Sequence, residues 1–217
     1  MTPLAPIQPR YLRDQAFLRL RDAIVEGHLA PGQAVVIDDL AATFGLSAMP
    51  VREAVKRLVS DGLIEELPRR AHRVMPLTRE SALAILGVTE TLMVRAYELG
   101  APRLGQEEIA RMREALAAAS ERSTAADVPG TLAAIHAMHG VVYEATGNPE
   151  FERLLAMLVP RFNRVLTLWY TESIADVART YRRGLVEALE RSDPDAAVEI
   201  MREAWRTFRR VIEARAD

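Results

Sequence analysis

The chain has 217 residues, of which 49% are hydrophobic and 27% are charged, with a formal net charge of −2 and no cysteine. This composition is typical of a soluble globular protein, and the length allows one large domain or two small ones. The lack of cysteine excludes disulfides, thiolate zinc sites and cysteine nucleophiles. Because no apolar run approaches the ~18–20 residues that span a bilayer and the first residues are too polar for a signal peptide, we expect a cytoplasmic protein without membrane association.

Short helices are predicted for the first part of the chain. Residues 1–10 contain three prolines and are expected to form a flexible arm. A helix is predicted over residues 11–26, because Phe17, Leu20 and Ile24 recur at helical spacing before a glycine. A second short helix is indicated by a further set of apolar residues before Gly45, namely Ile37, Leu40, Ala41 and Phe44.

A third helix is predicted after only a few turn residues. Ser47 is a favourable N-cap, and Pro50 is tolerated in a first helical turn. The apolar stripe of this helix consists of Val51, Val55, Leu58 and Val59. Two short strands are expected at residues 63–67 and 72–75, joined by a loop longer than a two-residue hairpin because residues 68–71 lack glycine.

This order of elements is the layout of a winged helix-turn-helix, in which the second helix of the pair enters the major groove of DNA. Burial of the apolar stripe leaves Ala48, Arg52 and Lys56 on the opposite face. Arg52 can donate two parallel hydrogen bonds to a guanine, whereas Lys56 is a point charge suited to phosphate. Basic outer faces are also common on solvated helices, so it is the order of elements that favours DNA binding. The basic residues of the wing, placed to reach the DNA backbone or minor groove, are Arg69, Arg70, His72 and Arg73.

The same stretch resembles the GntR family of bacterial transcription regulators. The resemblance lies in residues 23–32, 40–47, 50–58 and 61–64. The family usually reads Ser-Arg-Thr-Pro-Val-Arg-Glu-Ala-Leu, and here Ala48 and Met49 replace the first Arg and the Thr. This departure implies fewer contacts or a different operator, with the two apolar side chains against a thymine methyl. The residues expected at the DNA are Ser47, Ala48, Met49, Arg52, Lys56, Arg69, Arg70 and Arg73.

Residues 79–217 have a purely helical pattern. Breaks near residues 100–102, 127–130, 147–149 and 192–194 predict about five or six helices, and Pro160 is expected to kink or split one of them. By length, helix count, the spacing of His139 to Asn148-Pro149 and the pattern at residues 188–197, this part resembles the FCD domain of the FadR-like GntR branch.

Many FCD domains hold a divalent metal on one Asp and three His. By position, the resemblance assigns the Asp to Ile135 and the second and third His to Arg182 and Ala204, so only His139 remains. We therefore expect no metal and no other cofactor. His136 and His139 form an i, i+3 pair that leaves a metal fragment open, although core or pocket histidines are the commoner outcome.

Arg182 lies on a helix face with Tyr181 and Leu185, a position that allows its guanidinium to point into the bundle instead of into water. It is either a structural or snorkelling arginine or, with His139 and Tyr143, a site for the carboxylate or phosphate of an organic effector. Where the family often has Arg and Glu on the first helix, this chain has Thr89 and Met93, which implies a less polar pocket. The expected effector-binding residues are His136, His139, Tyr143, Arg182, Thr89 and Met93.

The sequence thus predicts a mostly α protein with a flexible arm (residues 1–10), a winged helix-turn-helix (11–78) and an all-α effector-binding and dimerisation domain (79–217). We expect a transcription regulator, a repressor, that binds a double-stranded DNA operator as a homodimer and responds to a small, anionic organic effector. The alternative is a ligand-binding protein with weakened DNA binding, because of Ala48 and Met49. An enzyme is disfavoured because the chain lacks paired Glu-x-x-His motifs, a Gly-x-Ser-x-Gly elbow and a Gly-rich phosphate loop.

Overall fold

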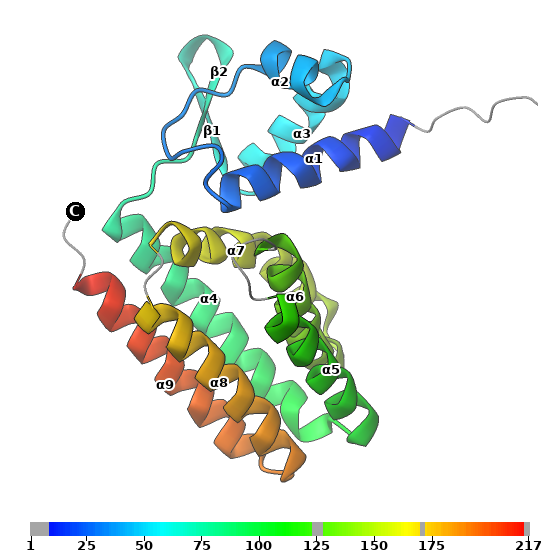
Figure 1. Cartoon of the computed structure of the whole chain (residues 1–217), viewed down its shortest axis with the longest axis vertical. Helices are drawn as coiled ribbons and strands as arrows, with labels where there is room; N and C mark the ends of the chain where they lie inside the picture. The colour runs from blue at the N-terminus through cyan, green and yellow to red at the C-terminus, as the bar shows by residue number, and fades with distance from the viewer. Residues whose placement is uncertain (1–8, 123–127, 170–171, 215–217) are drawn as a thin grey trace, which may run out of the picture. The chain divides into compact units, whose positions relative to one another are not determined.

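Helices and one small sheet make up the parts of the chain that the structure, a computed structural model, describes: residues 9–122, 128–169 and 172–214 (Figure 1). The chain divides into two units, Met1–Leu77 and Thr78–Asp217. The first contains three helices and a two-stranded wing, and the second is all-α. The predicted fold class is therefore confirmed.

The first unit begins with helix α1 (Pro9–Val25). Its first residue fits the first turn of a helix, where the missing N–H of proline costs nothing, so α1 includes the last two residues of the predicted arm. Residues 1–8 of that arm lie outside the described part. The elements that follow are α2 (Ile37–Phe44), α3 (Ala48–Ser60), β1 (Ile64–Leu67) and β2 (Ala71–Val74).

The turn between α2 and α3 depends on Gly45. This residue has a φ of 65°, the left-handed conformation that glycine adopts without steric cost. Its N–H donates to the Ala42 carbonyl at 3.2 Å, and the next N–H, of Leu46, donates to Ala41 at 2.9 Å, which satisfies the last carbonyls of α2. Ser47 occupies the N-cap position of α3 in an extended conformation, but its side chain accepts no capping hydrogen bond. Ser47 therefore occupies the predicted N-cap position, but the capping hydrogen bond of its side chain is not formed.

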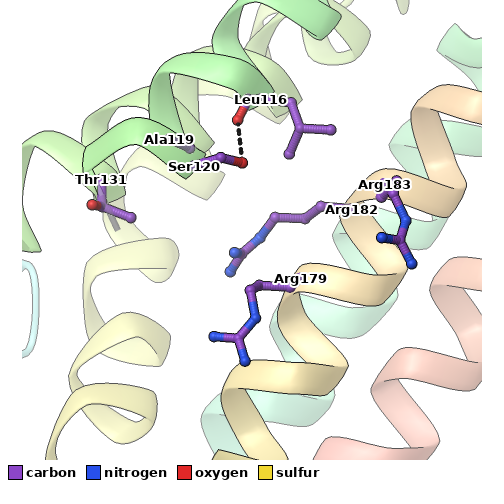
Figure 2. Close-up of a pocket in the computed structure, with 7 residues that line it drawn as sticks. All are labelled: Leu116, Ala119, Ser120, Thr131, Arg179, Arg182 and Arg183. Atoms are coloured by element: carbon purple, nitrogen blue, oxygen red, sulfur yellow. Dashed lines mark hydrogen bonds between the residues drawn. The ribbon is translucent and has the colours of Figure 1, made fainter. Parts of the chain in front are cut away.

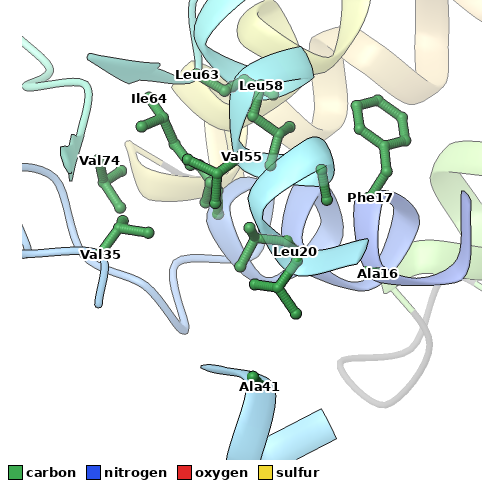
Figure 3. Packing of buried hydrophobic residues seen from close by; sticks show 13 residues of the cluster. Ala16, Phe17, Leu20, Val35, Ala41, Val55, Leu58, Leu63, Ile64 and Val74 are labelled. Atoms are coloured by element: carbon green, nitrogen blue, oxygen red, sulfur yellow. The ribbon is translucent and has the colours of Figure 1, made fainter. Parts of the chain in front are cut away.

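The core of the first unit forms where α1 and α3 pack together (Figure 3). Arg57 of α3 covers its edge, with the guanidinium carbon 3.7 Å from the centroid of the Phe17 ring. Figure 3 draws this cluster of buried residues, which fixes the orientation of α3: Ala16, Phe17, Leu20, Ile24, Val35, Ala41, Val51, Ala54, Val55, Leu58, Leu63, Ile64 and Val74.

The wing is an antiparallel pair in which Ile64 faces Val74 and Glu65 faces Arg73. A 3₁₀ turn over Pro68–Arg70 joins the strands, so the loop is longer than two residues, as predicted. The other edge of β2 bonds to the segment before α2: the Val35 N–H donates to the carbonyl of His72 at 2.8 Å. The wing is therefore anchored on both edges of β2.

The second unit contains six α-helices within its described residues. Helix α4 packs against α6, α7 and α9, while α5 pairs with α6 and also contacts α8, which packs on α9 (Figure 1). Thr78 caps α4 by accepting from the Ser81 N–H at 3.1 Å. The bounds are α4 (Arg79–Gly100), α5 (Gln106–Arg122), α6 (Val128–Ala145), α7 (Pro149–Leu168), α8 (Glu172–Glu190) and α9 (Pro194–Glu213).

Two predicted breaks in this unit differ from the observed helix bounds. Helix α7 runs continuously through Pro160, so of the kink or split predicted there, the split does not occur. Burial of Leu155, Leu158 and Phe162 on either side of the proline holds the helix together despite the lost backbone hydrogen bond. Helix α6 begins at Val128, which places part of the predicted break at 127–130 in its first turn; Asp127 lies outside the described residues.

Helices α4 and α6 approach closely at Gly100. A Cβ at this position would lie 2.3 Å from the carbonyl oxygen of Val142, a separation that no side chain allows. The close contact brings the buried faces of the two helices together one turn away, where Tyr97 of α4 meets His139 of α6. Gly100 thus contributes to the geometry of the site described next.

Candidate functional site

Helix α3 presents two basic side chains on the face opposite its buried stripe. Arg52 and Lys56 are both exposed. Lys56 donates to a carboxylate oxygen of Glu53 at 2.9 Å on the same helix, which reduces its free charge. Within the described parts of the chain, Arg52 forms no ion pair. The structure thus has both residues on the outer face, where the sequence predicts them. Of the two, Arg52 is the one whose positive charge has no acidic partner among the described residues.

The start of α3 is apolar as well as exposed. Met49 is 66% exposed, which is high for a large hydrophobic side chain, while Ala48 is half-buried and Ser47 exposed. No acidic residue lies in the first turn of the helix. This end of α3 therefore offers a methyl-bearing surface beside Arg52 and carries no carboxylate to repel phosphate.

The tip of the wing consists of two arginines in a strained conformation. Arg69 and Arg70 have φ values of 66° and 61°, the left-handed region that non-glycine residues rarely adopt, and both are exposed. Arg73 lies farther back and forms an ion pair across the strands with Glu65. The wing therefore presents two arginines at its tip, whereas the Arg73 guanidinium is already engaged.

In the helical unit, His139 lies in a cluster of three tyrosines. Its Nδ1 is 2.7 Å from the Tyr97 hydroxyl, with which it shares a hydrogen bond, and its Nε2 is 3.4 Å from the Tyr181 hydroxyl. The rings of Tyr143 and Tyr181 stack on the imidazole, with centroids 6.4 and 6.3 Å away. His139 and Tyr143, which the sequence predicts at one site, are indeed brought together, but in a packed core.

Burial determines the charge state of this cluster. Desolvation by burial, together with the positive charge of Arg182, lowers the pKa of His139 to about 3. Burial likewise holds the pKa of the Tyr97 and Tyr143 phenols well above its usual range. His139, Tyr97 and Tyr143 are therefore neutral at physiological pH, and the hydrogen bond between His139 and Tyr97 joins two uncharged side chains.

The residues at the family's metal positions do not fit a divalent cation. Ile135 and Ala204 are buried and have no donor atom, and Arg182 is itself cationic. His139 already uses Nδ1 toward Tyr97. Within residues 9–122, 128–169 and 172–214, no three His, Asp or Glu side chains come close enough to share a metal.

The other predicted effector residues lie around this core. Thr89 and Met93 are buried in α4, and the Thr89 hydroxyl donates to the Ile85 carbonyl at 2.7 Å. His136 is half-buried on α6, one turn before His139. Tyr97, which sequence reasoning missed, continues the four-residue spacing of Thr89 and Met93, and that spacing was the signal that could have found it.

A cavity of about 380 Å³ opens between α5, α6 and α8. Figure 2 shows Arg179 and Arg182 extending from α8 into the space that Ser120 and Thr131 border on the other side. Of the six residues predicted to bind an effector, only Arg182 lines this cavity, and its Nε is buried without a hydrogen-bond partner. The lining residues are Leu116, Ala119, Ser120, Thr131, Arg179, Arg182 and Arg183.

Comparison with family descriptions matches both units. Residues 12–74 match the description "Bacterial regulatory proteins, gntR family" and residues 84–207 match the FCD domain. The chain belongs to the GntR family of regulators with an FCD domain. The resemblance seen in the sequence is thereby confirmed, and this family consists of DNA-binding transcription regulators, not enzymes.

Individual relatives agree with this GntR assignment. BphR of Paraburkholderia xenovorans is 36% identical over 77 residues, which cover 36% of this chain and 31% of that protein. A probable D-xylose utilization operon transcriptional repressor of Paenarthrobacter nicotinovorans is 28% identical over 192 residues, 87% of this chain and 84% of that protein. A GntR regulator from Rhodococcus sp. RHA1 shares the fold, with a TM-score of 0.78 at 21% identity over 94% of this chain and 99% of that one.

No helix in the described part of this GntR regulator is long and apolar enough to cross a bilayer. The two candidate sites of the chain are the outer face of α3 with the wing tip and the arginine-lined cavity between α5, α6 and α8.

Proposed function

We propose that this GntR regulator represses transcription from the cytoplasm by binding an operator as a homodimer and that an effector in its FCD domain changes its operator affinity. The proposal that the chain binds DNA rests on the outer face of α3, where Arg52 is exposed and forms no ion pair within the described residues. A repressor role is also the one printed for the relative from Paenarthrobacter nicotinovorans.

Arg52 is proposed to read a guanine in the major groove. A guanidinium matches the O6 and N7 acceptors of guanine with two parallel hydrogen bonds. Met49 and Ala48, at the start of the same helix, would lie against the methyl groups of neighbouring thymines. Lys56 contributes less direct attraction to phosphate, because Glu53 neutralises part of its charge.

The wing tip is proposed to contact the phosphate backbone or minor groove. Arg69 and Arg70 are exposed and carry two positive charges on a short loop. Their left-handed backbone costs about 1–2 kcal/mol per residue, a cost that DNA binding can explain because strained residues cluster at functional sites. Arg73 is proposed to support the wing through Glu65, with DNA contact as a minor role.

A homodimer is proposed because one 13-residue helix reads too few base pairs for specificity. Two copies related by two-fold symmetry double the site and require a palindromic operator. Scrambling one half-site of the operator should therefore weaken binding almost as much as scrambling both.

The test is operator binding by the full chain, measured by fluorescence anisotropy with duplex DNA from upstream of its gene. Arg52→Ala should weaken specific binding by about 1–3 kcal/mol, and affinity should fall steeply between about 50 and 200 mM salt. The matched control is Arg153→Ala, an exposed arginine of α7 that pairs, among the residues the structure describes, with Glu150 alone. Equal operator affinity of the Arg52→Ala variant and the wild type would refute this reading of α3. Weak binding without salt dependence would favour the alternative of a ligand-binding protein with weakened DNA binding.

A further inference from the structure

The cavity of the FCD domain is lined by arginines from a single helix face. Arg179, Arg182 and Arg183 occupy positions i, i+3 and i+4 of α8, which lie next to one another on a helix. Figure 2 shows the Arg179 and Arg182 side chains extending from α8 into the cavity. None of the seven lining residues is acidic.

The charge of Arg182 is not compensated within the described chain. Its guanidinium carbon lies 5.5 Å from the centroid of the Tyr181 ring, and it forms no ion pair. Its Nε is buried and has no hydrogen-bond partner. A buried charged donor without a partner is unfavourable, so a ligand that accepts this hydrogen bond gains affinity from it.

Arg183 is only loosely held. Its Nε lies 3.7 Å from an oxygen of Glu187 at the surface, a separation too long for a good hydrogen bond. In another cavity of this domain, by contrast, the charge of the arginine is compensated by an acidic residue. This cavity has a volume of about 400 Å³, three of its lining residues are acidic, and its arginine, Arg202, pairs with Glu98 at 2.5 Å.

We propose that the cavity between α5, α6 and α8 binds a small organic anion with at least two negative charges, a phosphate monoester or a dicarboxylate. Guanidinium groups bind both through paired N–H donors, so two or three arginines on one wall favour a dianion over a monoanion. This inference rests on the proposed function in so far as the ligand is the effector.

The remaining lining residues restrict the ligand further. Leu116 and Ala119 supply an apolar wall, and the cavity volume of about 380 Å³ is near the lower end of the range for small-molecule sites. The Ser120 hydroxyl donates its proton to the Leu116 carbonyl at 2.9 Å, so its oxygen faces a ligand as an acceptor. A compact dianion with a few carbons and a hydroxyl donor fits this lining.

The test is isothermal titration calorimetry of the full chain without DNA, at constant ionic strength. The dianionic probes are succinate and glucose 6-phosphate, and their counterparts with less charge are acetate and glucose. Binding of either dianion supports the proposal, and which of them binds distinguishes a dicarboxylate from a phosphate ester. Binding of neither dianion, or equal binding of a dianion and its counterpart, would overturn it.

The variants assign the binding to the arginines. Arg182→Gln and Arg179→Gln should each weaken dianion binding by about tenfold or more, whereas Arg153→Gln, which removes the same charge from α7, should leave it unchanged. Arg179 is exposed, so its variant keeps the test open if Arg182→Gln does not fold. Equal affinities of all three variants would overturn the assignment. Because no DNA is present, loss of operator binding in the anisotropy assay would refute the proposed function and leave this result unaffected.

Discussion

Acid should destabilise the FCD domain through His139. In the folded protein this imidazole has a pKa of about 3, because it is buried among three tyrosines, whereas in the unfolded chain its pKa is about 6.5. Below pH 6.5 the unfolded state therefore binds a proton that the folded state does not, and stability is lost as the pH falls from there toward 3. Above pH 6.5 both states are neutral at this residue, and its contribution is constant.

The size of the effect follows from the two pKa values. At pH 5.5 about ten of eleven unfolded molecules carry the proton, which favours unfolding by about 1.4 kcal/mol relative to pH 7.5. A folded-state pKa anywhere well below 5.5 gives the same figure, so the magnitude does not depend on the lower value.

Urea unfolding at pH 7.5 and pH 5.5 measures this loss. Both tryptophans of the chain, Trp169 and Trp205, belong to the second unit, so their fluorescence reports on the FCD domain. The wild type should lose about 1.4 kcal/mol more than His139→Asn between the two pH values, because the variant lacks the titrating group. An equal loss in wild type and His139→Asn would refute the reasoning.

Three further substitutions test packing and strain. Gly100→Ala should lower the free energy of unfolding by about 1–3 kcal/mol, because the new Cβ meets the Val142 carbonyl. Gly140→Ala should raise it by about 0.4–1 kcal/mol, because nothing lies within 4 Å of the new Cβ. Urea titrations that show the same sign for both variants would contradict this packing. Arg70→Gly should stabilise the first unit by about 1 kcal/mol while weakening operator binding, since it relieves a left-handed backbone and removes a charge. A thermal melt unchanged from wild type would mean that the wing tip is not strained.

The DNA-binding unit was predictable because its signals are local. The amphipathic spacing of α1 and α3, the glycine of the intervening turn and the resemblance to one family all lie within short stretches of sequence. The exposed positions of Arg52 and Lys56 follow from burial of Val51 and Val55 on the other face of the same helix. The ion pairs of Lys56 and Arg73, by contrast, depend on rotamers and strand register, which the pattern does not specify.

The FCD domain was less predictable because its site is assembled from distant segments. No glycine or proline lies at the end of α7 near Leu168, so the sequence gives no local signal for the break before α8. Pro160, by contrast, suggests a break inside α7, but the packing of the helix keeps it continuous there. The cavity combines α5, α6 and α8, and only Arg182 could be placed in the bundle from helical periodicity. The partners of His139 also come from two other helices, α4 and α8.

The exposed outer face of α3 has a practical consequence for chemistry in solution. Lys56 is the sole lysine among 28 basic residues, and the chain has no cysteine. An amine-reactive dye therefore has one ε-amino target, on the helix proposed to enter the major groove, without any engineered residue. Such a label would obstruct the groove and break the pair with Glu53, so acylated and unmodified protein should differ in operator affinity although their FCD domains are chemically identical.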